Sequence, residues 1–368
     1  MKEGDSDFCY APEDVKDKWG ELYSQISSAS IKIERKKWKH FTPEFLDTHS
    51  QDLETADVLR AVENRKAVYS AEKIGQMEGH VEIETDMPVT IFQIGDIHSF
   101  SMFCNQELWE QHREKVLETP GTYMMFYHNL VDNAIPARYP DNMLKNTMPP
   151  DVQFKTMQKW IKELDGEGKV LAAIEGDCHE GWSYQVAGVS ASNLLYGYEG
   201  RNFPILENGG IMNVGVGEQK YSIGMWHKQG PYHSNFNPEH SLRQNRRLRR
   251  EGSTDAEVGA HHHRAAASSN YVGSRHDMRP VHFVRVGTYK GVPTVLGEGE
   301  DYITDTWAVD RFGTSGEPPA PSIMAWADRH VLDNTLDFDT GLEKHMALRT
   351  YALVKEMGLE EQFNDLMK

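Results

Sequence analysis

The hydrophobic pattern of the chain changes near Pro88. Before that point, apolar residues recur at helical spacing in Val58–Val62 and from Val68 to Ile74, which predicts a helical N-terminal region over residues 1–87. After it, short apolar runs alternate with amphipathic segments, as in α/β domains with crossover helices. We therefore predict an α/β domain over residues 88–315, followed by a C-terminal extension over residues 316–368 that packs on the core.

The predicted strands share an apolar run of five or six residues, and several end beside His, Asp, Asn or Gly. They are Val89–Ile94, Tyr123–Tyr127, Val170–Ile174, Tyr221–Trp226 and Val281–Val286 with Thr294–Leu296, together with a short strand at Glu257–Val258. Helical spacing predicts helices at Gln106–Leu117, Val152–Leu164, Ile323–Leu332 and Leu342–Met357. Because open α/β sheets bind ligands at the carboxyl ends of their strands, the polar residues there are the candidates for function.

Composition favours a globular protein in a reducing compartment. The chain has 368 residues, of which 39% are hydrophobic and 26% charged, and no run approaches the roughly 18 apolar residues of a membrane span. The N-terminus lacks the pattern of a secretory signal. Cys9, Cys104 and Cys178 are odd in number and widely spaced, so a disulfide framework is not expected. The expected location is the cytoplasm.

The negative net charge of the chain limits the kinds of partner that it can bind. The formal net charge of −17 repels polyanions on average, so any contact with nucleic acid must be local. The segment Ser241–Gly252 contains five arginines. It is interpreted either as a solvated basic face or as a patch that steers a polyanion towards the protein.

Acidic and imidazole side chains follow the first predicted strand of the domain. Asp96 and His98 lie two residues apart after Gly95. In extended backbone such residues project to the same side, so both can reach one ion. A carboxylate with an imidazole suits Mn, Fe or Zn better than Ca.

Further histidines follow other predicted strands. His261 and His263 repeat the alternation, His227 ends a strand, and His179 lies in Gly176-Asp177-Cys178-His179-Glu180. Each alone is typical of a structural histidine. Four strand ends that carry ligand-type residues in one α/β unit together predict a metal site.

The order of these motifs is similar to that of a known family. Asp-x-His, Gly-Asp-x-x-Asp, Gly-Asn-His-Asp/Glu, a single His and Gly-His-x-His form the signature of calcineurin-like metallophosphoesterases. The chain resembles this family from Pro88 to about Gly299, and the runs Val131–Ala134 and Asn235–Pro238 are similar to phage-type members. The resemblance implies a four-layer αββα sandwich that holds two divalent ions, Mn²⁺ first, with Fe, Zn or Ni as alternatives.

The resemblance also implies roles for individual residues. Asp96, His98 and His263 would hold one ion, His227 and His261 the other, and His179 would donate to the phosphate or protonate the leaving group. Asp96 and His179 would thus lie nearest the chemistry, which is attack by a bridging hydroxide on a phosphate ester. His128 and Arg264 are weaker candidates for substrate contact.

Two departures from the family pattern leave alternatives open. Asn129 stands at the position of the bridging aspartate, and either Asp177 or Cys178 stands where the family has a ligand asparagine. Asp177 could restore the charge lost at Asn129, whereas a Cys178 thiolate would favour zinc. In a third interpretation the site has decayed and binds one ion or none.

The sequence therefore predicts a metal-dependent phosphoesterase, with phosphodiesters such as DNA ends as the favoured substrate. Two alternatives remain: a degenerate scaffold with a binding or structural role, and a monoesterase or nucleotide phosphatase. The oligomeric state is not indicated.

Overall fold

The computed structural model describes residues 78–133, 146–175, 191–207, 209–227, 237–248, 254–274, 277–290 and 320–356. The chain divides into two compact units, Met1–Lys73 and Ile74–Lys368, and every described residue belongs to the second. The predicted helices before residue 78, the strand Thr294–Leu296 and the segment Asp177–His179 lie outside the described residues.

The described residues form two mixed six-stranded sheets. The first has the order β12-β11-β2-β3-β4-β5, and the second has the order β1-β6-β7-β8-β10-β9. The strands of the first sheet are β2 (Val89–Ile94), β3 (Thr122–Tyr127), β4 (Val170–Glu175), β5 (Ile205–Glu207), β11 (Ser322–Ala325) and β12 (Leu332–Thr335). Those of the second are β1 (Glu78–Ile83), β6 (Gly210–Val216), β7 (Gln219–Trp226), β8 (Ala256–Gly259), β9 (Ala266–Ser274) and β10 (Asp277–Arg285).

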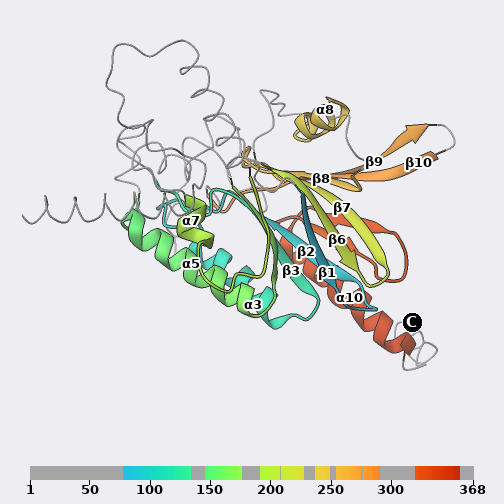
Figure 1. The fold of residues 1–368 in the computed structure, drawn as a ribbon, viewed down its shortest axis with the longest axis horizontal. Helices are drawn as coiled ribbons and strands as arrows, with labels where there is room; N and C mark the ends of the chain where they lie inside the picture. The colour runs from blue at the N-terminus through green and yellow to red at the C-terminus, as the bar shows by residue number, and fades with distance from the viewer. Residues whose placement is uncertain are drawn as a thin grey trace, which may run out of the picture. The chain divides into compact units, whose positions relative to one another are not determined.

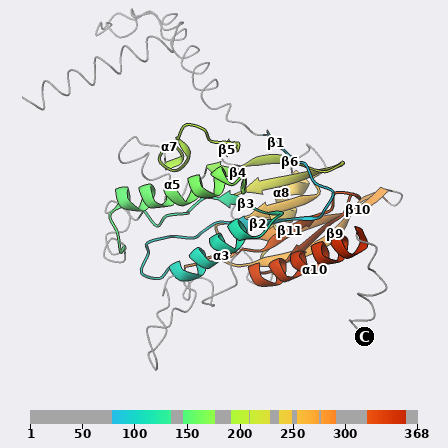
Figure 2. The same cartoon turned by 90° about the horizontal axis from the view of Figure 1, so that it is seen from below.

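Helices cover the outer faces of the two sheets. Figures 1 and 2 show α3 (Gln106–Glu118), α5 (Pro150–Gly166), α7 (Ala191–Tyr196) and α10 (Phe338–Glu356) on one side, and Figure 1 shows α8 (His240–Leu248) on the other. Asn105 begins α3, because its side-chain oxygen accepts from the Leu108 backbone N–H. Within the described part of the chain, no helix is long and apolar enough to cross a membrane. The helices are thus the outer layers of a sandwich.

Side-chain alternation along β2 explains why this strand is central. Val89 and Ile91 lie in the core between the two sheets, whereas Phe92 and Ile94 lie in the core between the first sheet and its helices. Every residue of β2 is buried, including the polar Thr90 and Gln93, so neither face of the strand is exposed to solvent. The two cores make a four-layer α/β arrangement, which is consistent with a metallophosphoesterase sandwich.

The strands and helices of the central part were largely predictable. The prediction for β2 matches its bounds, and those for β3, β4, β7, β8 and β10 are confirmed with shifts at their ends. The helices α3, α5 and α10 are confirmed as well. The basic segment after residue 240 is helical as α8.

Two regions predicted as helical contain strands, and β5, β6, β9 and α7 lie where no element was predicted. Residues 323–332, predicted as a helix, contain β11 and the start of β12, and β11 pairs antiparallel with β2. Periodicity cannot distinguish so short an apolar run in a buried strand from a helical turn. Within the region 1–87 predicted as helical, Glu78–Ile83 forms β1 and pairs parallel with β6. The C-terminal extension therefore contributes two strands to a sheet, and β1 precedes the predicted start of the domain.

A buried histidine on α3 makes stability depend on pH. The ring of His112 stacks on Phe338 with centroids 3.9 Å apart, and its Nδ1 lies 2.8 Å from the Tyr289 hydroxyl. Burial lowers the pKa of His112 from 6.5 to about 4. The unfolded chain therefore binds a proton at His112 more tightly than the folded protein does. The contribution of neutral His112 to stability is fully present above about pH 6.5 and is lost as the pH falls towards 4.

Replacing His112 with Phe is expected to remove this dependence. Between pH 7 and pH 4 the wild type should lose about 3 kcal/mol more unfolding free energy than the variant, at about 1.36 kcal/mol per pKa unit. Urea titrations at several pH values would measure the difference. Parallel stability curves for the two proteins would contradict the assignment.

Candidate metal centre

Four strands of the two sheets end at one place. Asp96 and His98 follow β2, Asn129 follows β3, His227 follows β7, and His261 and His263 follow β8. Gly95 permits this approach, because a Cβ there would lie 2.8 Å from the Tyr127 Cβ and 3.3 Å from the Ala260 Cβ. A larger residue at position 95 would push the ends of β2, β3 and β8 apart.

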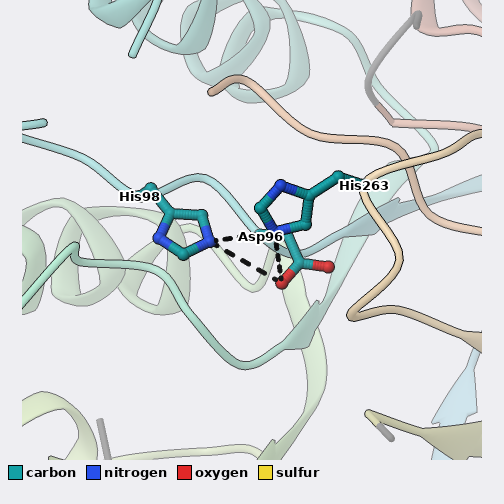
Figure 3. Close-up of side chains that lie close together, drawn as sticks. All are labelled: Asp96, His98 and His263. Atoms are coloured by element: carbon teal, nitrogen blue, oxygen red, sulfur yellow. Dashed lines mark hydrogen bonds and ion pairs between the residues drawn. The ribbon is translucent and has the colours of Figure 1, made fainter. Parts of the chain in front are cut away.

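Three side chains offer ligand atoms to a common point. Single ligand atoms of Asp96, His98 and His263 all lie within 4.8 Å of one another. The Nε2 atoms of His98 and His263 are 3.1 Å apart, and they lie 4.0 Å and 3.7 Å from Asp96 Oδ1, respectively. Figure 3 shows both imidazole rings turned towards this carboxylate. The group is buried, with the Asp96 side chain fully inaccessible.

Asn129 joins this group to the other two histidines. Its Nδ2 donates to Asp96 Oδ1 at 3.0 Å and lies 3.4 Å from His227 Nε2. His227 Nδ1 lies 3.0 Å from the Tyr127 carbonyl oxygen, which turns Nε2 towards Asn129. The rings of His227 and His261 meet edge to face with centroids 5.1 Å apart, and the His261 backbone N–H donates to Asp96 Oδ2.

Burial shifts the ionisation of two of these residues. It raises the pKa of Asp96 from 3.8 to about 7, although hydrogen bonds from Asn129 and from the His261 backbone act in the opposite direction. Burial, followed by the charges of His128 and His261, lowers the pKa of His227 well below 6.5. His227 is therefore a neutral imidazole, the form in which histidine binds metals.

The ligand-bearing loops have an unusual backbone. Asp96, His98, Asn129, His261 and His263 all have positive φ, between 46° and 77°. The expectation that the pairs at positions 96/98 and 261/263 converge by alternation in extended backbone is therefore wrong. They converge in left-handed turns, a conformation that non-glycine residues adopt rarely and that is concentrated at functional sites.

The chemistry of these residues fits a divalent cation. Asn129 is buried, and among the described residues its Oδ1 has no hydrogen-bond partner, while its Nδ2 is oriented by Asp96. A buried carbonyl oxygen of this kind is unfavourable unless a cation or a donor reaches it. Together with the carboxyl group of Asp96 and the imidazoles of the cluster, it makes a donor set typical of Mn, Fe or Zn sites.

The structure brings six of the eight predicted metal ligands into one cluster: Asp96, His98, Asn129, His227, His261 and His263. Asp177, Cys178 and the predicted acid His179 lie outside the described residues and stay predictions. His128 is buried, with its ring 4.9 Å from that of His227. Arg264 is only partly buried.

Three residues around the cluster were not singled out from the sequence. Thr288 Oγ1 donates to the Asp96 carbonyl oxygen at 2.6 Å, and Lys290 Nζ lies 2.9 Å from Asp132 Oδ1. The fully buried Arg285 donates to the Ala260 carbonyl oxygen, directly before His261. All three lie at the end of β10 or just after it, where the sequence showed a strand but no ligand-type residue.

The basic helix α8 is partly used for internal contacts. Arg243 pairs with Glu239 at 2.9 Å, and Arg246 lies 3.8 Å from the buried Glu257. Arg247 is exposed. Arg243 and Arg246 therefore stabilise the position of α8, and they are not free to steer a polyanion as the interpretation of the whole segment requires.

Comparisons with solved structures give distant matches, including one to a Zn²⁺ complex. The crystal structure of wild-type Vps29 from Entamoeba histolytica, complexed with Zn²⁺, matches at 12% sequence identity and a TM-score of 0.30, covering 68% of this chain and 99% of that chain. No family model matches the sequence, and no curated protein matches it. The interpretation of the centre therefore rests on its own geometry.

Proposed function

We propose that the protein is a metal-dependent phosphoesterase that cleaves phosphodiesters. The observation that supports it most directly is the convergence of Asp96, His98 and His263 on one buried point, with single ligand atoms of each within 4.8 Å of one another. The preference for diesters, DNA ends among them, rests on the resemblance of the motifs to phage-type metallophosphoesterases. Mn²⁺ is the proposed physiological metal, and the cytoplasm the proposed location.

The cluster divides naturally into two halves around Asp96. His98 and His263 lie near Asp96 Oδ1, while Asn129, His227 and His261 form the adjoining half. We propose that each half holds one divalent ion, and that Asp177 or Cys178 completes the second half. Asp96 borders both halves, because its Oδ1 lies 4.0 Å and 3.7 Å from the Nε2 atoms of His98 and His263 and also accepts from Asn129.

In the proposed reaction, the side chains of the cluster would hold the ions, and His179 would supply a proton. When bound, divalent ions supply positive charge for the phosphate oxygens and lower the pKa of water towards neutrality. Hydrogen bonds hold the buried His227 and Asp96 side chains in place, so binding an ion would require little reorganisation. His179 is proposed to protonate the leaving oxygen.

Asn129 favours one other candidate function. At the family's bridging position it offers a neutral amide where a carboxylate is expected, which weakens the attraction for a second ion. A binding or structural protein on a degenerate scaffold would tolerate this change. The two functions differ in whether added metal produces turnover.

Purified protein is expected to hydrolyse a chromogenic phosphodiester only when Mn²⁺ is added. His98→Ala should lower the rate by at least about 100-fold, because it removes a ligand, and His179→Ala by about 100-fold through loss of a proton donor. His330→Ala is a matched control, since the His330 side chain is 53% exposed, pairs with Asp255 and stacks on Tyr221, neither of which belongs to the cluster. Rates should be followed by absorbance over a range of Mn²⁺ concentrations.

The control and the choice of substrates decide between the functions. Folded wild-type protein that shows no turnover with any divalent metal would contradict the proposal and favour the degenerate scaffold. Parallel rates on a monoester, a diester and a cyclic nucleotide would identify the substrate class. A higher kcat/KM on the monoester would replace the diesterase assignment.

A further inference from the structure

We propose that Lys290 is a positioning residue of the metal centre, which holds Asp132 in place to fix the orientation and tautomer of His98. The inference rests on the proposed metal site. Asp132 Oδ1 lies 3.0 Å from His98 Nδ1 and 2.9 Å from Lys290 Nζ, so one oxygen serves both groups. The three side chains form a continuous line that ends at the candidate ligand atom His98 Nε2.

All three members of this line are shielded from water. The side chains of His98 and Asp132 are each 1% exposed, and that of Lys290 is 8% exposed. Burial of an ammonium and a carboxylate is costly unless each is paired with good geometry. Such an arrangement restricts the rotamer of Asp132 far more than a solvent-exposed ion pair would.

The backbone places Lys290 against the same loops that carry the metal ligands. Its N–H donates to Thr288 Oγ1 at 3.0 Å, and that hydroxyl donates to the Asp96 carbonyl oxygen. Lys290 also forms a backbone bridge with Cys104, in the loop that follows His98. Asp132 is fixed in turn, because its N–H donates to the Ser99 carbonyl oxygen at 3.1 Å.

The chemistry of imidazole explains what this line does. A histidine that donates its Nδ1 proton to a carboxylate keeps its Nε2 lone pair, and Nε2 is the atom that lies near Asp96 and His263. Outer groups that hold a ligand histidine in this way commonly change metal affinity by about 10–100-fold when they are removed. Lys290 is proposed to act on His98 through Asp132, as a positioning residue and not as a ligand.

The test compares three lysine variants in Mn²⁺ binding measured by isothermal titration calorimetry. Lys290→Met should weaken binding by about 10–100-fold, and Lys290→Arg should recover most of it because a guanidinium can still donate to Asp132. Lys115→Met is the matched control: it removes a lysine 2.8 Å from Asp339 in an exposed ion pair, and it should leave binding unchanged. Thermal unfolding of each variant verifies that it is folded.

A second measurement uses the wild-type protein and does not depend on any variant folding. In the metal-free protein, the ¹⁵N resonances of His98 should report a proton on Nδ1. A proton on Nε2 alone would overturn the proposal, as would wild-type Mn²⁺ affinity in folded Lys290→Met protein. If the wild type binds no metal at all, the proposed function fails. If it binds metal and Lys290→Met binds it equally well, only the role of Lys290 fails.

Discussion

Replacing Asn129 with Asp is expected to lower the stability of the metal-free protein and to strengthen its binding of Mn²⁺. Asn129 Nδ2 donates to Asp96 Oδ1 at 3.0 Å, and both residues are at most 1% exposed. A second carboxylate there would face the first, and two acids so close cannot both ionise without a cation. We expect a loss of about 2–4 kcal/mol of unfolding free energy without metal.

With Mn²⁺ present, the same substitution should have the opposite effect. An additional negative ligand increases attraction for the ion, so affinity should rise by at least about tenfold. Melting temperatures with and without Mn²⁺ would measure both effects. Asn129→Ala is the control, because it removes the donated hydrogen bond without adding charge, and it should not strengthen binding. An Asn129→Asp protein with unchanged metal-free stability and an unchanged Mn²⁺ response would contradict the prediction.

The same variant separates the interpretations of the departures from the family pattern. A large rise in phosphodiester hydrolysis would mean that Asn129 limits the wild-type centre. Unchanged or lower activity, despite tighter metal binding, would favour the alternative in which Asp177 already supplies the missing charge.

Replacing Arg285 with Met should produce the largest loss of stability. Arg285 is fully buried and donates to the carbonyl oxygens of Ala260 and Pro238 at 2.8 Å and 3.0 Å, and also to the Ser241 hydroxyl. Burial lowers its pKa to about 10, so the guanidinium stays charged at neutral pH. Loss of the donors would strand buried acceptors and cost about 3–5 kcal/mol.

The change at Arg285 should also weaken metal binding, because Ala260 immediately precedes His261 in the loop after β8. Chemical denaturation would give the stability, and Mn²⁺ titration the affinity. Arg329→Met provides a matched control at a side chain that is 59% exposed, where the expected change is within about 0.5 kcal/mol. Equal losses in the two variants would show that the Arg285 contacts do not anchor the loop.

Much of the central fold could be predicted from the chain itself. The strands β2, β3 and β4 are runs of apolar residues bounded by polar ones, and α3 and α5 have clear helical spacing. The polar residues just after those strands were identified as candidate ligands, because α/β sheets bind ligands at the carboxyl ends of their strands. Local pattern and general sheet topology were sufficient for these elements.

Long-range pairing accounts for what could not be predicted. β11 becomes a strand because it pairs with β2, more than two hundred residues earlier, and no local signal distinguishes it from a helix. β1 alternates exposed and inward positions over only six residues, and it takes its structure from pairing with β6. Lys290 follows β10 without any motif, so only the folded arrangement reveals its contact with Asp132.

The backbone at the centre could not be predicted for a different reason. Positive φ at Asp96 or His261 depends on hydrogen bonds made in the folded state, such as Asp96 N–H to the His128 carbonyl oxygen. Sequence alternation alone suggested extended strands that direct both side chains to one side. The prediction that these side chains converge is thus right, although the backbone conformation from which it was inferred is wrong.

The division of the cluster between the two sheets links metal binding to the rate at which the folded protein unfolds. Asp96, His98 and Asn129 follow strands of the first sheet, whereas His227, His261 and His263 follow strands of the second, and Asp96 and His261 lie 165 residues apart. An ion held by both sets would act as a clasp between the layers, formed only after both have assembled. Metal supply would then govern how long a finished molecule resists unfolding and proteolysis, and would leave the rate at which it folds almost untouched.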